Sequence, residues 1–69
     1  MVEVFKTDIK STSDAHNLVE MLVQQLPGSR INFDLHDCDN ILRVEGNDFS
    51  ADAVVNLLSK KGFHCEVLE

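Results

Sequence analysis

Residues 30–46, RINFDLHDCDNILRVEG, contain two apolar–polar alternations separated by a polar turn. In the first alternation, Ile31, Phe33 and Leu35 fall on one side of the chain and polar residues fall on the other. A period of two is typical of a strand with one buried face. Aspartate and asparagine favour turns because their side chains bond to the nearby backbone. The stretch therefore predicts a β-hairpin. Its parts are a strand over residues 30–36, a turn over residues 37–40 and a returning strand over residues 41–46.

Two segments outside the hairpin carry the period of an amphipathic helix. In residues 13–26 apolar side chains recur every three or four positions, after a run of hydroxyl residues and before a Pro-Gly pair. Hydroxyl side chains cap helix starts, whereas proline and glycine end helices. A second apolar stripe over residues 51–61 follows Ser50, which suits an N-cap, and a glycine comes after it. Alternating segments at residues 2–9 and 63–68 predict two further strands.

The predicted order of elements is β-α-β-β-α-β, and residues 1–69 are expected to form a single domain. Two right-handed βαβ units joined by a hairpin give an α+β, ferredoxin-like sandwich. We expect a four-stranded antiparallel sheet with strand order 4-1-3-2 and with both helices on one face.

The chain is small and acidic. It has 12 acidic and 6 basic side chains and a net charge of -6. That charge repels nucleic-acid phosphates and anionic membranes, so we expect neither as a partner. No apolar run reaches the roughly 18 residues that a membrane-spanning helix needs, and MVEVFKTD lacks the regions of a signal peptide. We therefore expect a cytoplasmic protein in which Cys38 and Cys65 are free thiols.

Three stretches are similar to a known family. LPGSRINFDL at residues 26–35 resembles the LPGV…V.VDL segment of heavy-metal-associated (HMA) domains, the small modules of copper chaperones and metal-pumping ATPases. LRVEG at residues 42–46 and SADAVVNLLSKKGFHCEVL at residues 50–68 are similar to that family's V.V.G and S.E.I...I...GY.AEVL patterns. The match covers nearly the whole chain in order and spacing, and it implies the same ferredoxin-like fold.

The resemblance does not extend to the metal-binding motif of the family. HMA domains carry M-x-C-x-x-C between the first strand and the first helix, where two thiolates hold a soft ion such as Cu(I). The four positions where C-x-x-C would stand are Thr12, Ser13, Asp14 and Ala15, and no cysteine occurs in the first 37 residues. Hydroxyls and one carboxylate do not replace two thiolates. The resemblance therefore implies a degenerate HMA-like domain, and we expect no cofactor.

Residues 36–39, HDCD, leave two interpretations open. His36 and Cys38, with Asp37 or Asp39, could bind one transition-metal ion, either within one chain or completed by the same turn of a second copy. This mixed ligand set suits Zn²⁺, Ni²⁺ or Co²⁺ better than Cu(I). The other interpretation is a polar turn. We favour the turn because C-x-x-C and H-x-x-x-H spacings are both missing.

The remaining histidines and the second cysteine have simpler interpretations. Cys65 alternates with apolar neighbours, so we expect a buried, inert thiol. His64 then faces the open side of the sheet beside Glu66, and His16 is expected to be solvated. Strands lie about 4.8 Å apart, which places the hairpin roughly 10 to 14 Å from the last strand. One metal ion does not collect ligands across that distance.

The sequence favours an interaction module over an enzyme. A cysteine nucleophile needs an oriented histidine, and the pair on this short turn offers no pocket. We expect a protein partner, and the net charge favours a basic one. The free edges of the outer strands could also pair two copies, giving a monomer or a weak homodimer. A purely structural domain without a ligand is a third alternative. The expected partner-binding surface consists of Thr12, Ser13, Asp14, His36, Asp37 and Asp39.

Overall fold

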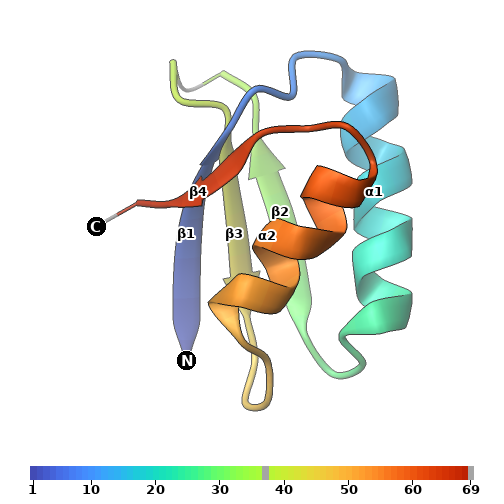
Figure 1. The fold of residues 1–69 in the computed structure, drawn as a ribbon, viewed down its shortest axis with the longest axis vertical. Coiled ribbons are helices and arrows are strands. Elements are labelled where there is room, and N and C mark those ends of the chain that lie inside the picture. Colours follow the sequence, from blue (N-terminus) through green and yellow to red (C-terminus); the bar gives the residue numbers. More distant parts are fainter. Residues whose placement is uncertain (37, 69) are drawn as a thin grey trace.

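The computed structural model describes residues 1–36 and 38–68 of the chain. The elements follow in the predicted order (Figure 1). The strands are β1 (Val2–Thr7), β2 (Arg30–Asp34), β3 (Ile41–Glu45) and β4 (Cys65–Val67), and the helices are α1 (Thr12–Gln25) and α2 (Ala51–Lys60).

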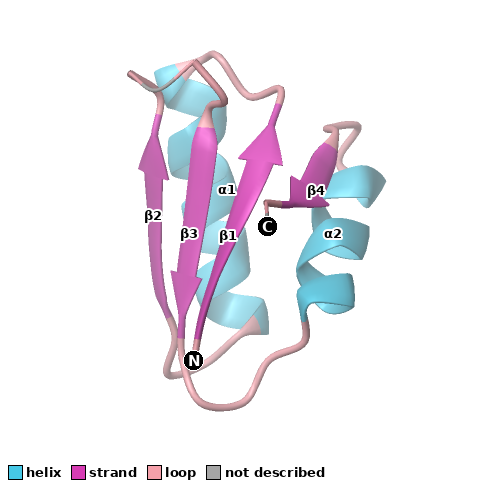
Figure 2. Ribbon diagram, turned by 90° about the vertical axis from the view of Figure 1, so that its left-hand side faces the viewer, coloured by secondary structure: helices cyan, strands magenta, loops and turns pink. Residues whose placement is uncertain are grey.

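The four strands form one antiparallel sheet in the order β2-β3-β1-β4. This is the predicted order 4-1-3-2 counted from the other side, so the ferredoxin-like arrangement is confirmed. Both helices lie behind the sheet in Figure 2, and its other face is open. Strands β2 and β4 are the outer strands. None of the described helices is long and apolar enough to cross a membrane.

The strands are shorter than the sequence predicted. β1 ends at Thr7 instead of residue 9, β2 ends at Asp34 instead of residue 36, and β4 has only three residues. At the end of β2 the backbone N–H of His36 donates to Asp34 Oδ1 at 3.1 Å. That local bond begins the turn, because it gives the backbone a partner outside the sheet.

The apolar stripes of the helices and the inner face of the sheet enclose one core. Phe5 and Leu42 from the sheet and Leu22 and Leu58 from the helices have no solvent exposure. The helices begin where hydroxyl residues cap them: Ser11 Oγ accepts from the N–H of Asp14, and Ser50 Oγ accepts from the N–H of Ala53. The Ser50 cap is the one that the sequence predicted. The other core residues are Ile9, Ala15, Leu18, Leu26, Ile31, Val44, Val54 and Cys65.

Thr7 is a buried polar residue at the end of β1, with a solvent exposure of 4%. Its hydroxyl donates to the carbonyl oxygen of Asn40 at 2.6 Å and accepts from the N–H of Ile9 at 3.3 Å. Its own N–H donates to the carbonyl oxygen of Asp39 at 3.2 Å. The residue therefore connects β1 to the hairpin turn and shapes the start of the loop toward α1.

Replacing the Thr7 hydroxyl should destabilise the domain while preserving its shape. Thr7→Val keeps the β-branched volume but leaves the Asn40 carbonyl and the Ile9 N–H without this partner, which costs about 1–3 kcal/mol. Thr12→Val, at an exposed threonine, is the matched control and should cost less than about 0.5 kcal/mol. Urea unfolding followed by circular dichroism measures both changes. Equal stabilities of the two variants would contradict the assigned role of Thr7.

Candidate functional site

Three loops meet at one end of the molecule. The Thr7 N–H bonds to the hairpin at Asp39, as described above. On the other side of β1, the N–H of Asp8 donates to the carbonyl oxygen of His64 at 3.3 Å, and the N–H of His64 donates to Asp8 Oδ1 at 2.9 Å. We call this end, formed by the β1–α1 loop, the hairpin turn and the α2–β4 loop, the loop pole. It lies at the top of Figure 1.

The first turn of α1 stands where an HMA domain would carry its cysteine pair. Thr12 and Ser13 are exposed, Asp14 is half-buried and Ala15 is buried against the core. The available side-chain donors are two hydroxyls and one carboxylate, which are hard oxygen ligands. They do not fit Cu(I), which prefers sulfur.

The hairpin turn presents His36 and Cys38 to solvent. Asp39 Oδ1 lies 3.9 Å from Lys6 Nζ, and Asn40 has a positive φ of 48°, a conformation that asparagine tolerates in turns. Asp37 lies outside the described residues. The predicted ligand set of His36, Asp37, Cys38 and Asp39 therefore stays a prediction.

The histidine and cysteine pairs of the loop pole lie on opposite sides of β1. Thr7 of β1 is the register partner of Cys65, whereas Lys6 is the register partner of Ile41 at the start of β3. The predicted separation of the hairpin from the last strand follows from this order. In the part of the chain that the structure describes, no group of three or more His, Cys, Asp and Glu side chains is arranged to hold a metal ion.

Cys65 is buried, as the sequence predicted, with 6% exposure. Burial raises the pKa of its thiol from 9.0 to about 11, and the nearby carboxylates of Asp8 and Glu66 add to the rise. Both causes disfavour the thiolate, which is the form that binds metals and attacks electrophiles. At neutral pH this buried thiol is therefore protonated.

The other two histidines contact carboxylates on the surface. His64 Nε2 lies 3.3 Å from Glu66 Oε2, on the exposed side of β4 where the sequence placed it. His16 Nε2 lies 3.2 Å from Glu20 Oε1, one turn further along α1. All four side chains are exposed, so these contacts are solvated surface pairs.

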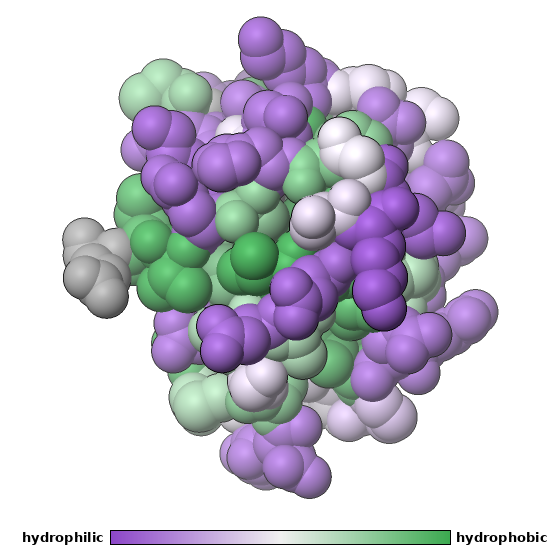
Figure 3. Space-filling model, viewed as in Figure 1, coloured by the Kyte–Doolittle hydropathy of each residue, from purple (hydrophilic) through white to green (hydrophobic). Residues whose placement is uncertain are grey.

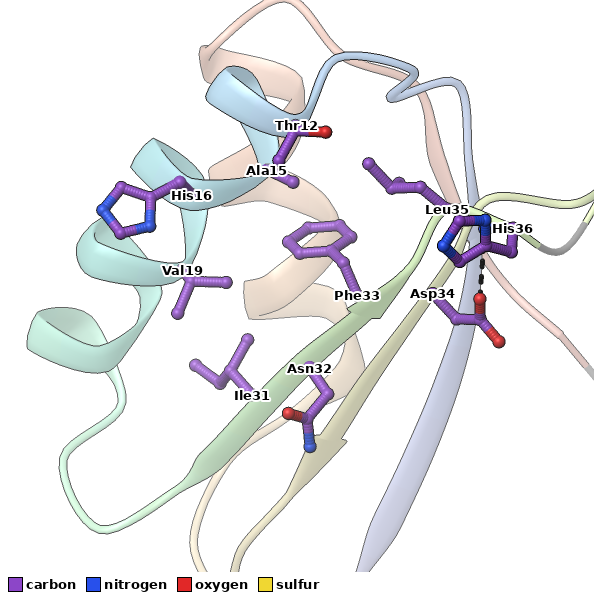
Figure 4. A pocket seen from close by; sticks show the side chains of 10 residues that line it. All are labelled: Thr12, Ala15, His16, Val19, Ile31, Asn32, Phe33, Asp34, Leu35 and His36. Carbon is purple, nitrogen blue, oxygen red and sulfur yellow. Dashed lines mark hydrogen bonds between the residues drawn. The ribbon is translucent and has the colours of Figure 1, made fainter.

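A groove between α1 and β2 adjoins the loop pole and was not predicted from the sequence. It has a volume of about 380 Å³. Figure 4 shows Ile31, Phe33 and Val19 pointing toward one another, with Leu35 nearer the loop pole. Asn32 and Asp34 point away from the groove in the same view. The sequence did contain a signal for this groove: a row of large apolar residues on the inner face of an outer strand. An outer strand has a neighbouring strand on one side only, so side chains on its inner face can stay partly uncovered. The polar residues that line the groove are Thr12, His16, Asn32, Asp34 and His36.

Comparison with solved structures finds the same fold in the yeast copper transporter domain Ccc2a, whose solution structure was determined in the apo and Cu(I)-loaded states. The TM-score is 0.76, and the match covers 99% of this chain and 94% of that chain at 20% sequence identity. The chain therefore has the fold of an HMA domain, as its resemblance to that family implied. No protein-family model and no curated protein matches the sequence.

The raised pKa of Cys65 predicts a loss of stability in alkaline solution. In the unfolded chain this thiol ionises near pH 9, whereas in the folded chain it stays protonated up to about pH 11. The contribution to stability is thus complete below pH 9 and is lost as the pH rises toward 11, by about 3 kcal/mol. Urea unfolding at pH 8 and pH 10.5 measures the change. Cys65→Ala should remove this part of the pH dependence and Cys38→Ala should retain it; the same dependence in both variants would refute the assignment.

Proposed function

We propose that this chain is a protein-interaction module built on the HMA fold, and that it binds its partner at the loop pole. The observation that carries the proposal is the groove beside the pole. Its apolar floor is open to solvent at the same end of the sheet where the predicted partner residues Thr12, Ser13 and His36 lie.

The groove has the features of an anchor site for one apolar side chain. Leu35 and Ala15 line its end nearest the pole, and Thr12 and His36 supply polar groups around them. Interfaces concentrate their binding energy in such pockets, where an apolar or aromatic anchor is desolvated inside a polar rim. A partner segment with one large apolar residue fits this geometry.

Charge selects the kind of segment. The chain carries a net charge of -6, Asp34 is among the residues that line the groove, and Asp14 and Asp39 belong to the first turn of α1 and to the hairpin turn of the loop pole. Complementary charge speeds association and makes it sensitive to salt. We therefore propose a partner in which lysine or arginine residues flank the apolar anchor, and we place this interaction in the cytoplasm, where free thiols persist.

We further propose that the domain acts without catalysis. Cys65 is buried with a raised pKa, and His64 contacts Glu66 instead of a thiol. Cys65 and His64 therefore do not form a nucleophile and base, because a cysteine nucleophile needs a low pKa and an oriented base.

The proposal is tested by site-directed photo-crosslinking in the cells that produce the protein. A photoreactive side chain at position Ser13, on the loop pole, should capture one partner that the same side chain at Asn47, in the β3–α2 loop at the other end, does not. Identical capture at both positions, or none at Ser13, would contradict the proposal.

The captured partner is then purified and titrated by calorimetry. Asp14→Lys should weaken binding at least about ten-fold and reduce its salt dependence. Asp52→Lys is the matched control, because both aspartates lie in the first turn of a helix and only Asp14 lies at the loop pole. Equal losses in the two variants would point to helix destabilisation and not to contact with the partner.

Binding of a transition-metal ion at the hairpin turn is a second candidate function. It is favoured by one observation: Cys38 is an exposed free thiol on the same turn as the exposed His36. Zn²⁺, Ni²⁺ or Co²⁺ would suit these ligands together with Asp37 or Asp39.

Native mass spectrometry of the reduced protein, titrated with Zn²⁺, Ni²⁺ and Cu(I), tests this second function. Retention of one ion by the wild type and by Cys65→Ala, with loss in Cys38→Ala, would establish the metal site. Our primary proposal expects no stoichiometric ion in any of the three proteins. Retention in Cys38→Ala would exclude Cys38 as a ligand.

A further inference from the structure

Strand β2 has a free edge that is suited to pairing. It lies at the end of the sheet, and β3 is its sheet neighbour. Its five residues pair with β3 in continuous register, without a bulge, and include neither proline nor lysine. Alternate residues of an outer strand direct their N–H and C=O groups away from the sheet, where a second strand can pair with them. Of the features that discourage such pairing, β2 lacks proline, lysine and a bulge, and it carries one charged residue at each end, Arg30 and Asp34.

The sequence of β2, Arg30-Ile31-Asn32-Phe33-Asp34, is complementary to itself in the antiparallel direction. If a two-fold axis passes through Asn32, Arg30 of one copy stands opposite Asp34 of the other, and this happens twice. Both side chains are exposed on the open face of the sheet, so oppositely charged groups come together there. Register shifts by two residues keep the faces matched but lose these charge pairs.

The inner face is matched in the same register. Ile31 of one copy stands opposite Phe33 of the other, on the helix side where both residues line the groove. Figure 4 shows Val19 of α1 beside this part of the groove. An incoming strand therefore extends the apolar floor of the groove and covers its middle, while the end beside Leu35 stays open at the loop pole.

We propose that two copies of the chain associate through β2, antiparallel and about a two-fold axis at Asn32, so that two four-stranded sheets form one continuous sheet. This inference stands independently of the function proposed for the loop pole. The association is weak, because a five-residue strand pair buries much less than the roughly 1,600 Å² of a standard stable interface. It is also sensitive to salt, because the charge pairs are exposed.

Strand β4, the other outer strand, is the main alternative site for association of two copies, but its charges do not favour pairing. Exposed apolar side chains of Val67 and Leu68 lie at the C-terminal end of β4, where Figure 3 shows a hydrophobic patch. The strand has only three residues, and an antiparallel pair centred on it places Glu66 opposite Glu66 of the second copy. Like charges directly opposite each other destabilise a strand pair.

Charge reversal provides a test that separates this register from every other contact. In Arg30→Asp, an aspartate faces Asp34 of the second copy; in Asp34→Arg, an arginine faces Arg30. Each variant alone should dimerise at least ten-fold more weakly than the wild type. An equimolar mixture should form a heterodimer, because every charge pair across its axis is again attractive. Sedimentation velocity over a range of concentrations and salt measures all four samples, and Glu66→Lys on β4 is the control that should dimerise at least as well as the wild type.

Three results would overturn the proposal: a wild-type protein that stays monomeric at millimolar concentration, single variants that dimerise like the wild type, or a mixture without heterodimer. Circular dichroism checks that each variant is folded. If a variant is unfolded, hydrogen exchange of the wild-type protein tests the proposal instead. As the protein concentration rises, the backbone amides of residues 30–34 should become more protected, whereas those of residues 65–67 should not. Partner binding at the loop pole is scored separately with Asp14→Lys, which should leave dimerisation unchanged.

Discussion

The hydroxyl of Thr7 is the contact on which the shape of the loop pole depends. A hydroxyl buried to this degree must be paired, and here it bonds to the hairpin at Asn40 and to the following loop at Ile9. The backbone of the same residue bonds to Asp39. One residue at the end of a central strand thus fixes the hairpin turn against the loop that leads into α1. Among the residues that the structure describes, Thr7 is the buried polar residue.

The loop pole is therefore held by hydrogen bonds of the protein itself. Asp8 and His64 complete the arrangement on the other side of β1: the N–H of Asp8 donates to the carbonyl oxygen of His64, and the N–H of His64 donates to the side-chain Oδ1 of Asp8. Some small metal-binding domains fold only when the ion is bound, because metal binding and folding are coupled. Here the described loops keep a defined form with two hydroxyls and a carboxylate where the HMA family has thiolates. Partner binding at this pole, as proposed above, would then require no bound metal.

The fold could be predicted from the sequence because the spacing of apolar residues was distinct in each strand and helix. Ile31 and Phe33 alternate with polar residues, the helix stripes are amphipathic, and Ser50 marks a helix start. Strand ends were less predictable, because local bonds such as that from His36 to Asp34 compete with the sheet. The groove was missed for a different reason. Its volume depends on how far α1 stands from the edge of β2, and that distance is set by packing across the whole core and not by any local pattern.

The proposed partner-binding surface and the proposed dimer contact lie on different parts of the molecule, so both can be occupied in one dimer. The loop pole is at the end of the strands, whereas the proposed dimer contact runs along the side of β2. An antiparallel pair about Asn32 directs the two loop poles in opposite directions. A dimer of this form would offer two equivalent sites to a partner with repeated basic segments, and the second contact would then be intramolecular. Two weak contacts that reinforce each other in this way give tight binding only when both are engaged, so the strength of partner binding would depend on the concentration of the domain itself.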